Sequence, residues 1–178
     1  MHRHEKRVWP LAVALAALAG YIDAVGFIWL GGFFVSFMSG NSTRLAVGVA
    51  DGSAAALVAG ALIGAFVAGA IGGSLVASLA GGRRKVAVLA LVTILLSAAA
   101  AFAATGLERS AIALLALAMG AENAVFRRGG EVSIGVTYMT GALVKLAHGI
   151  ADAMLGGERW SWLPYLLLWC GLVAGAVG

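Results

Sequence analysis

The chain has 178 residues, of which 62% are hydrophobic and 11% are charged. Soluble domains are about half apolar and a quarter charged, so this composition excludes a soluble domain and indicates a polytopic membrane protein. The formal net charge of +4 does not indicate nucleic-acid binding, because the basic residues stand in short groups at the ends of apolar segments.

Seven apolar segments approach the roughly 20 residues that a helix needs to cross a bilayer. They cover about 8–30, 33–50, 54–80, 86–104, 110–127, 132–153 and 161–178. Trp9 and Trp29 bracket the first segment and suit the two interfaces of a membrane. We therefore predict an all-α integral membrane bundle that forms a single membrane domain over 1–178.

Several stretches of the first half recur in the second half. VSFMSGNSTRLAVGVAD (35–51) matches VTYMTGALVKLAHGIAD (136–152), GYIDAV (20–25) matches GAENAV (120–125), and FVAGAIG (66–72) matches LVAGAVG (172–178). These matches predict an internal duplication, in which repeat A (about 8–80) and repeat B (about 110–178) flank a connecting helix (about 86–104). The second copy stops earlier than the first, so we expect it to be truncated.

The distribution of basic residues leaves two topologies open. If all seven segments cross the membrane, ten flanking Lys and Arg residues divide five against five and give no orientation. If 33–50 and 132–153 instead dip into the membrane and return, nine of the ten share one side and only Arg109 lies opposite. The second arrangement would make the repeats inverted, as in several secondary transporters.

Polar residues inside apolar segments are the candidates for a functional site, because an ionisable group there is costly and normally faces protein or water. The predicted path residues are Asp23, Ser39, Asn41, Arg44, Glu122, Asn123, Thr140, Lys145 and His148. The simplest pairing joins Asp23 to Arg44 and Glu122 to Lys145. Such pairs either brace the helices or line a path for a solute or protons, and the sequence leaves both roles open.

Helical spacing places Lys145, His148 and Asp152 on one face of the sixth segment. An imidazole at this place suits either a proton relay or a structural hydrogen bond. Gly40 and Gly141 mark points where each polar segment would break or approach another backbone closely.

Small residues in the third segment predict close helix packing. Gly60, Gly64, Ala68 and Gly72 recur at a spacing of four, with Ala65, Gly69 and Gly73 beside them. We favour packing within the chain over the seam of a homo-oligomer, which stays open.

The sequence contains no Walker-type phosphate loop, no nucleophile elbow and no metal-ligand motif. We therefore expect neither enzyme activity nor a cofactor or metal. The expected partners are the lipid bilayer and an unknown small solute, and no nucleic acid. Our first hypothesis is a transport protein, with or without proton coupling, and the alternative is a membrane scaffold or assembly partner that transports nothing.

The motifs GYIDAVGF, FFVSFMSGN, GAENAV and YMTG together resemble the YoaK family of bacterial integral membrane proteins (domain of unknown function 1275). The resemblance covers nearly the whole chain and implies a bacterial cytoplasmic membrane protein. Family members typically read MTGN where this chain has Met38-Ser39-Gly40-Asn41, and QNA where it has Glu122-Asn123-Ala124. Glu for Gln places a carboxyl where the family has an amide, so an ion pair at Glu122 would not be common to the family.

Overall fold

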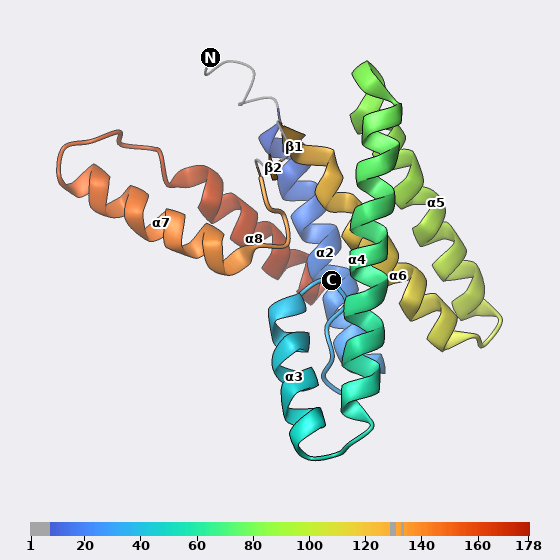
Figure 1. Ribbon diagram of the computed structural model, residues 1–178. Coiled ribbons are helices and arrows are strands. Elements are labelled where there is room, and N and C mark those ends of the chain that lie inside the picture. Colours follow the sequence, from blue (N-terminus) through green and yellow to red (C-terminus); the bar gives the residue numbers. More distant parts are fainter. Residues whose placement is uncertain (1–7, 129–130, 133) are drawn as a thin grey trace. The chain divides into compact units, whose positions relative to one another are not determined.

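The computed structural model describes residues 8–128, 131–132 and 134–178. Each predicted segment contains one α-helix (Figure 1), and the described chain is almost entirely helical. The helices are α2 (Trp9–Trp29), α3 (Met38–Ala50), α4 (Ala55–Leu79), α5 (Arg84–Ala104), α6 (Glu108–Glu122), α7 (Met139–Met154) and α8 (Leu163–Val177). Short 3-10 turns occupy Gly81–Arg83 and Asn123–Phe126, and Arg127–Arg128 pairs antiparallel with Glu131–Val132.

The fold divides into two compact units. The terminal unit combines the chain up to Tyr21 with Ile134–Gly178, and the central unit is Ile22–Ser133. These units do not follow the predicted repeats, because the first turns of α2 belong with the carboxyl-terminal helices. The prediction of one membrane domain stays a prediction.

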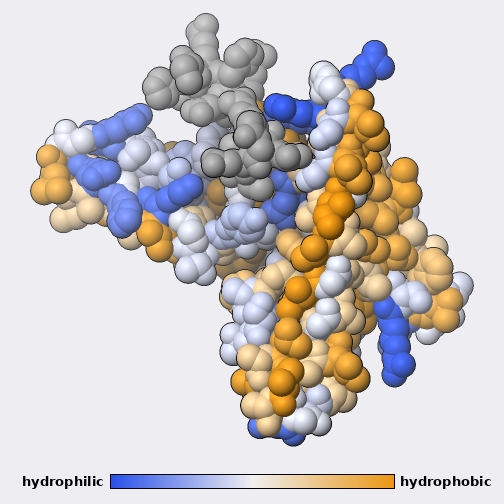
Figure 2. Space-filling view, in the orientation of Figure 1, coloured by the Kyte–Doolittle hydropathy of each residue, from blue (hydrophilic) through white to orange (hydrophobic). Residues whose placement is uncertain are grey.

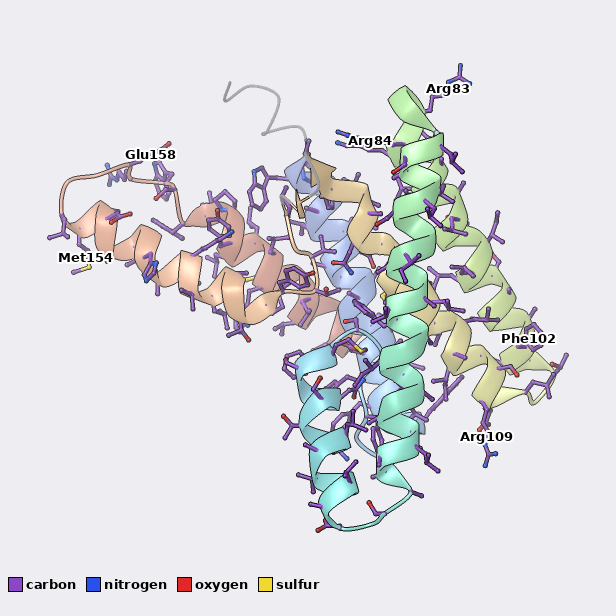
Figure 3. All side chains as sticks on the ribbon, viewed as in Figure 1. Arg83, Arg84, Phe102, Arg109, Met154 and Glu158 are labelled. Atoms are coloured by element: carbon purple, nitrogen blue, oxygen red, sulfur yellow. The ribbon has the colours of Figure 1, made fainter. Side chains whose placement is uncertain are left out.

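Three long helices form the body of the central unit, where α6 packs against both α4 and α5. Helices α4 and α5 are each long and apolar enough to cross a membrane, as is α2, and so is α6 together with the 3-10 turn that follows it (Glu108–Phe126). Hydrophobic side chains cover the outer surface along α4 and α5 (Figure 2), as expected for helices that face lipid. Charged residues gather at the ends: Arg83 and Arg84 lie at one end of the α4–α5 hairpin, and Arg109 lies at the opposite end (Figure 3). The basic residues that precede the first apolar segment, Arg3, Lys6 and Arg7, lie outside the described residues.

Glycines set the distance between α4 and α6. A Cβ atom on Gly69 would overlap the carbonyl oxygen of Leu117, and one on Gly120 would overlap that of Phe66. A Cβ atom on Gly73 would come within 2.7 Å of the carbonyl oxygen of Ala121. The two backbones are therefore in direct contact, which only small residues permit.

The predicted packing ladder is displaced by one residue. A Cβ atom on Gly64 or Gly72 would meet nothing within 4 Å, and Ala68 is exposed. Gly60 has one neighbour, a methyl carbon of Leu45 on α3, which would lie 3.8 Å from the added atom. The helix buries Gly69 and Gly73 instead, because a one-residue step turns the contact face by about 100°.

The terminal unit repeats this kind of contact between α2 and α8. A Cβ atom on Gly20 would overlap the carbonyl oxygen of Leu172, and one on Gly175 would overlap that of Ala17. The rings of Trp9 and Tyr165 meet edge to face at 5.7 Å between centroids. Helix α7 packs on α8, where Gly149 lies against the backbone of Trp162.

Two helices begin later than predicted. Helix α3 starts at Met38 rather than 33, and α7 starts at Met139 rather than 132. The 13 residues of α3 span about 20 Å, against about 30 Å for a bilayer core. Helix α3 is too short to cross alone, and it packs against α4 (Figure 1). The length of α3 therefore favours the re-entrant interpretation of 33–50.

Candidate functional site

The candidate site of the central unit is a non-helical stretch, Phe33–Phe37, that links α2 to α3. Its backbone lies outside any helix, so its N–H and C=O groups need partners from elsewhere. Polar side chains of α2 and α3 supply them. We call Phe33–Phe37 the linker.

Asp23 of α2 binds the middle of the linker. Its Oδ1 atom accepts hydrogen bonds from the backbone N–H groups of Val35 at 2.7 Å and Ser36 at 2.6 Å. Its Oδ2 atom accepts a third from the hydroxyl of Ser36 at 2.7 Å. Charge-assisted bonds of this kind are about twice as strong as neutral ones. The linker therefore lies beside α2 at the level of Asp23, which is about 9 Å along the helix axis from the last residue of α2, Trp29.

Asn41 of α3 holds the beginning of the linker. Its Oδ1 atom accepts from the N–H of Phe34 at 3.0 Å, and its Nδ2 atom donates to the carbonyl oxygen of Phe34 at 2.5 Å. The side chain is completely buried, and both of its polar ends are used. A residue predicted for the path therefore has a structural role: it replaces the partner that a neighbouring strand would give to Phe34.

Arg44 of α3 also contacts the linker, and it does not contact Asp23. Its guanidinium carbon is 4.7 Å from the ring centroid of Phe33, a cation–π contact. Gly32 has φ +102°, and a Cβ atom there would lie 2.5 Å from an Arg44 nitrogen, so glycine leaves room for the guanidinium. The predicted ion pair of Asp23 with Arg44 is wrong, because the linker supplies the partners of both residues.

Helix α3 begins directly after the linker, and no side chain caps its first turn. Ser39, in that turn, is exposed, and the hydroxyls of Ser42 and Thr43 bond back to the carbonyl oxygens of Met38 and Ser39. An α-helix leaves its first N–H groups free and carries partial positive charge there. The arrangement can therefore present backbone donors, a hydroxyl and a guanidinium to a polar solute.

A second group of predicted residues lies at the end of α6. Glu122 is 0% exposed, and no described residue of its unit donates a hydrogen bond to either carboxyl oxygen. Asn123 is also buried and donates from Nδ2 to the carbonyl oxygen of Met119 at 2.9 Å. The α-helix changes to a 3-10 turn directly after Glu122. A buried acid thus stands at an irregularity of the backbone.

The remaining predicted residues lie on α7 in the terminal unit. Thr140, Lys145, His148 and Asp152 are exposed, and the Lys145 ammonium is 5.6 Å from the ring centroid of Tyr165. Lys145, His148 and Asp152 share one helix, as predicted from their spacing. Glu122 and Lys145 belong to different units, so their pairing stays a prediction.

Sequence reasoning missed the linker residues Phe33, Phe34 and Ser36. Their apolar run appeared to begin a helix, and nothing in it resembles a turn except the preceding Gly31 and Gly32, both with positive φ. Two glycines before an apolar run that contains a serine were the only available signal. No group of His, Cys, Asp and Glu that could hold a metal ion occurs within the described residues.

Comparisons with known proteins agree with a membrane location. The chain matches a family model described as protein of unknown function (DUF1275) over residues 11–178. The UPF0700 transmembrane protein RA0705 of Rhizobium meliloti (strain 1021) is 36% identical over 167 residues, which cover 94% of this chain and 72% of that protein. No solved structure matches the chain. The match confirms the family inferred from the motifs, and with the apolar helices it supports an integral membrane protein.

Proposed function

This chain belongs to the DUF1275 family of proteins of unknown function, and we propose that it is a transport protein of the bacterial cytoplasmic membrane. It moves a small polar solute and has no catalytic activity. The observation that carries the proposal is the interrupted segment formed by the linker and α3. Irregular backbone at membrane depth occurs where it is buried in protein or lines a cavity, and discontinuous helices form the substrate sites of several secondary transporters.

The polar residues of this segment divide between two roles. Asp23 and Asn41 are positioning residues, because Asp23 bonds to Val35 and Ser36 of the linker and Asn41 uses both polar ends of its side chain on Phe34. Ser39 and Arg44 are the residues that meet the solute, since the Ser39 side chain is exposed and Arg44 has no ion-pair partner in the described chain. In the second polar segment, Thr140, Lys145 and His148 take the corresponding place, since all three are exposed on α7.

An internal duplication is part of this proposal, and the glycine contacts support it. The contact of Gly20 with Leu172 corresponds to that of Gly120 with Phe66, if the first helices are offset by 100 residues and the third helices by 106. The same offsets relate the contact of Gly175 with Ala17 to that of Gly69 with Leu117. In both units, the first helix of one half packs on the third helix of the other half.

Solute flux into vesicles tests the transport function. The purified chain is reconstituted in lipid vesicles, and uptake of a panel of small anions, cations and zwitterions is measured against empty vesicles. We expect uptake of at least one class, with a loss of about tenfold or more in Arg44→Gln, which removes the charge that faces the solute. Absence of uptake across the panel would count against transport.

The alternative is a scaffold that holds a partner protein in the membrane. The open ladder of Gly64, Ala68 and Gly72 on α4 favours it, because such a face suits close contact with another helix. Crosslinking in native membranes separates the two functions. A stoichiometric partner that is lost in Gly64→Leu, together with no flux, would replace transport by assembly.

A further inference from the structure

Glu122 is a buried carboxyl group on α6 that has no part in the proposed solute site at the linker and α3. It ends α6 within a run of completely or nearly completely buried residues, from Ala118 to Phe126. No described residue of its unit donates to Oε1 or Oε2. The other buried polar side chains of the unit differ, since Ser36, Asn41 and Asn123 all form hydrogen bonds. Within the described central unit, Glu122 is thus buried without the hydrogen-bond partners that the buried polar side chains around it have.

The helices that pack against α6 contribute no cation to this carboxyl. Helix α4 carries no charged residue, and its glycines bring the two backbones into contact beside Ala121. Helix α5 carries Arg84 and Lys85 in its first turn, and the Lys85 ammonium lies 5.9 Å from the ring centroid of Phe126. The other charges of α6, Glu108 and Arg109, stand in its first turn, at the far end from Glu122.

The surroundings of Glu122 fit a proton better than a metal ion. A Na⁺, Mg²⁺ or Ca²⁺ ion needs several oxygen ligands, and no group of acidic residues or histidines in the described chain converges on this place. A proton needs only the carboxyl itself. A carboxylate without partners is strongly disfavoured in such surroundings, whereas the neutral acid has only a modest desolvation cost.

We propose that Glu122 is the proton-binding group of this transporter, a role that rests on the proposed function. In the state described here, the carboxyl holds its proton. When the site opens to water, the O–H bond breaks, the proton passes to water on that side, and the carboxylate waits for a proton from the other side. Movement of the solute is then coupled to movement of one proton.

Infrared spectroscopy tests the proton without any need for transport. A protonated carboxyl has a C=O stretching band separate from that of a carboxylate, and the band shifts in D₂O when its proton exchanges. We expect the purified wild-type protein and the control Glu108→Gln to show an exchanging band that is absent in Glu122→Gln. Glu108 is a matched control because it is an exposed acid on the same helix. A spectrum that is unchanged in Glu122→Gln, or a wild-type band that never exchanges, would overturn the proposal.

Flux measurements then test the coupling. We expect a pH gradient to accelerate uptake into wild-type and Glu108→Gln vesicles about tenfold, and to have no effect on Glu122→Gln, which still exchanges solute at equilibrium. A gradient response that persists in Glu122→Gln would overturn the proposal. If the wild type moves no solute, the transport function fails, while the infrared band still decides whether Glu122 binds an exchangeable proton. If Glu122→Gln does not fold, exchange of the wild-type band and its intensity over a pH series decide.

Discussion

Asp23 shows how a single carboxylate can set the path of the chain. It accepts three hydrogen bonds from the linker, two of them from the backbone N–H groups of Val35 and Ser36. Removing the acceptor leaves these donors in a largely buried place, and each buried group without a partner costs about 1–3 kcal/mol. The residue is therefore more important for the position of α3 than a surface charge would be.

We expect Asp23→Ala to destabilise the protein strongly and Asp23→Asn to have a smaller effect. An asparagine keeps one oxygen for the two N–H groups, whereas alanine leaves all three donors of the linker without an acceptor. Thermal unfolding in detergent and the monodisperse fraction in gel filtration measure the difference. Equal stability of Asp23→Ala and the wild type would mean that the linker finds other partners.

Arg44 provides a second test at the same scale, because the structure and the sequence predict opposite results. In an ion pair with Asp23, removal of both charges would restore the stability lost in either single variant. With Arg44 on Phe33, the single variant Arg44→Ala loses about 0.5–1 kcal/mol of cation–π contact. We therefore expect the double variant Asp23→Ala, Arg44→Ala to be less stable than either single variant. A double variant that regains the stability lost in the single variants would instead support an ion pair between Asp23 and Arg44.

At the scale of the elements, the sequence predicts apolar helices well and interruptions poorly. Helix α2 begins at Trp9 and ends at Trp29, as the two tryptophans indicate, and Pro164 stands in the first turn of α8. The sequence predicts a helix that includes residues 33–37, because an apolar run with Phe and Val reads the same whether it is helical or not. The bonds of Asp23 and Asn41 to this stretch join residues that are 7 to 13 positions apart. A pattern of neighbouring residues does not predict these hydrogen bonds.

The candidate site was also predictable only in part, because the sequence reveals polar residues but not their partners. Asn41, Arg44 and Glu122 were found because polar side chains are conspicuous in an apolar sequence. Their partners were not predictable, since the partners of Asn41 and Asp23 are mainly backbone groups and that of Arg44 is an aromatic ring. A prediction from charge pairing considers only ionisable groups, so it misses the partners of Asp23, Asn41 and Arg44.

The re-entrant interpretation of 33–50 predicts which loops share a side of the membrane. Single cysteines replace Trp29, Ser53 and Gly82 after Cys170→Ser removes the native thiol, and an impermeant maleimide is added from one side. We expect positions 29 and 53 to react from the same side and position 82 from the other. Ser53 is preferable to Gly52, whose φ of +63° disfavours any side chain. Reaction of positions 29 and 53 from opposite sides would require 33–50 to cross.

Helix α4 offers a matched pair of glycines for a test of packing. Gly69→Leu would force a side chain into the carbonyl of Leu117, and we expect a loss of at least about 1–3 kcal/mol or failure to fold. Gly64→Leu, five residues away on the same helix, meets open space, and we expect unchanged thermal stability in detergent. A large loss in Gly64→Leu would instead place a packed neighbour on the predicted ladder.

At the scale of the whole molecule, the proposed duplication relates contacts that belong to different units. Gly20 and Gly120 are 100 residues apart in sequence, and each leaves room for a carbonyl oxygen of a third helix. Because each first helix packs on the third helix of the other half, neither half contains a complete set of its own contacts.

Parallel substitutions test this equivalence. We expect Gly20→Val and Gly120→Val to lower the unfolding temperature by similar amounts, because in each case the new side chain overlaps the backbone of the facing helix, at Leu172 or Phe66. Gly141→Val is the control, since it lies within α7 with nothing within 4 Å of its added Cβ atom. Its stability should remain near that of the wild type. Loss of stability in only one of the two first helices would mean that the matching sequences do not occupy matching places, and the case for inverted halves would lose its structural support.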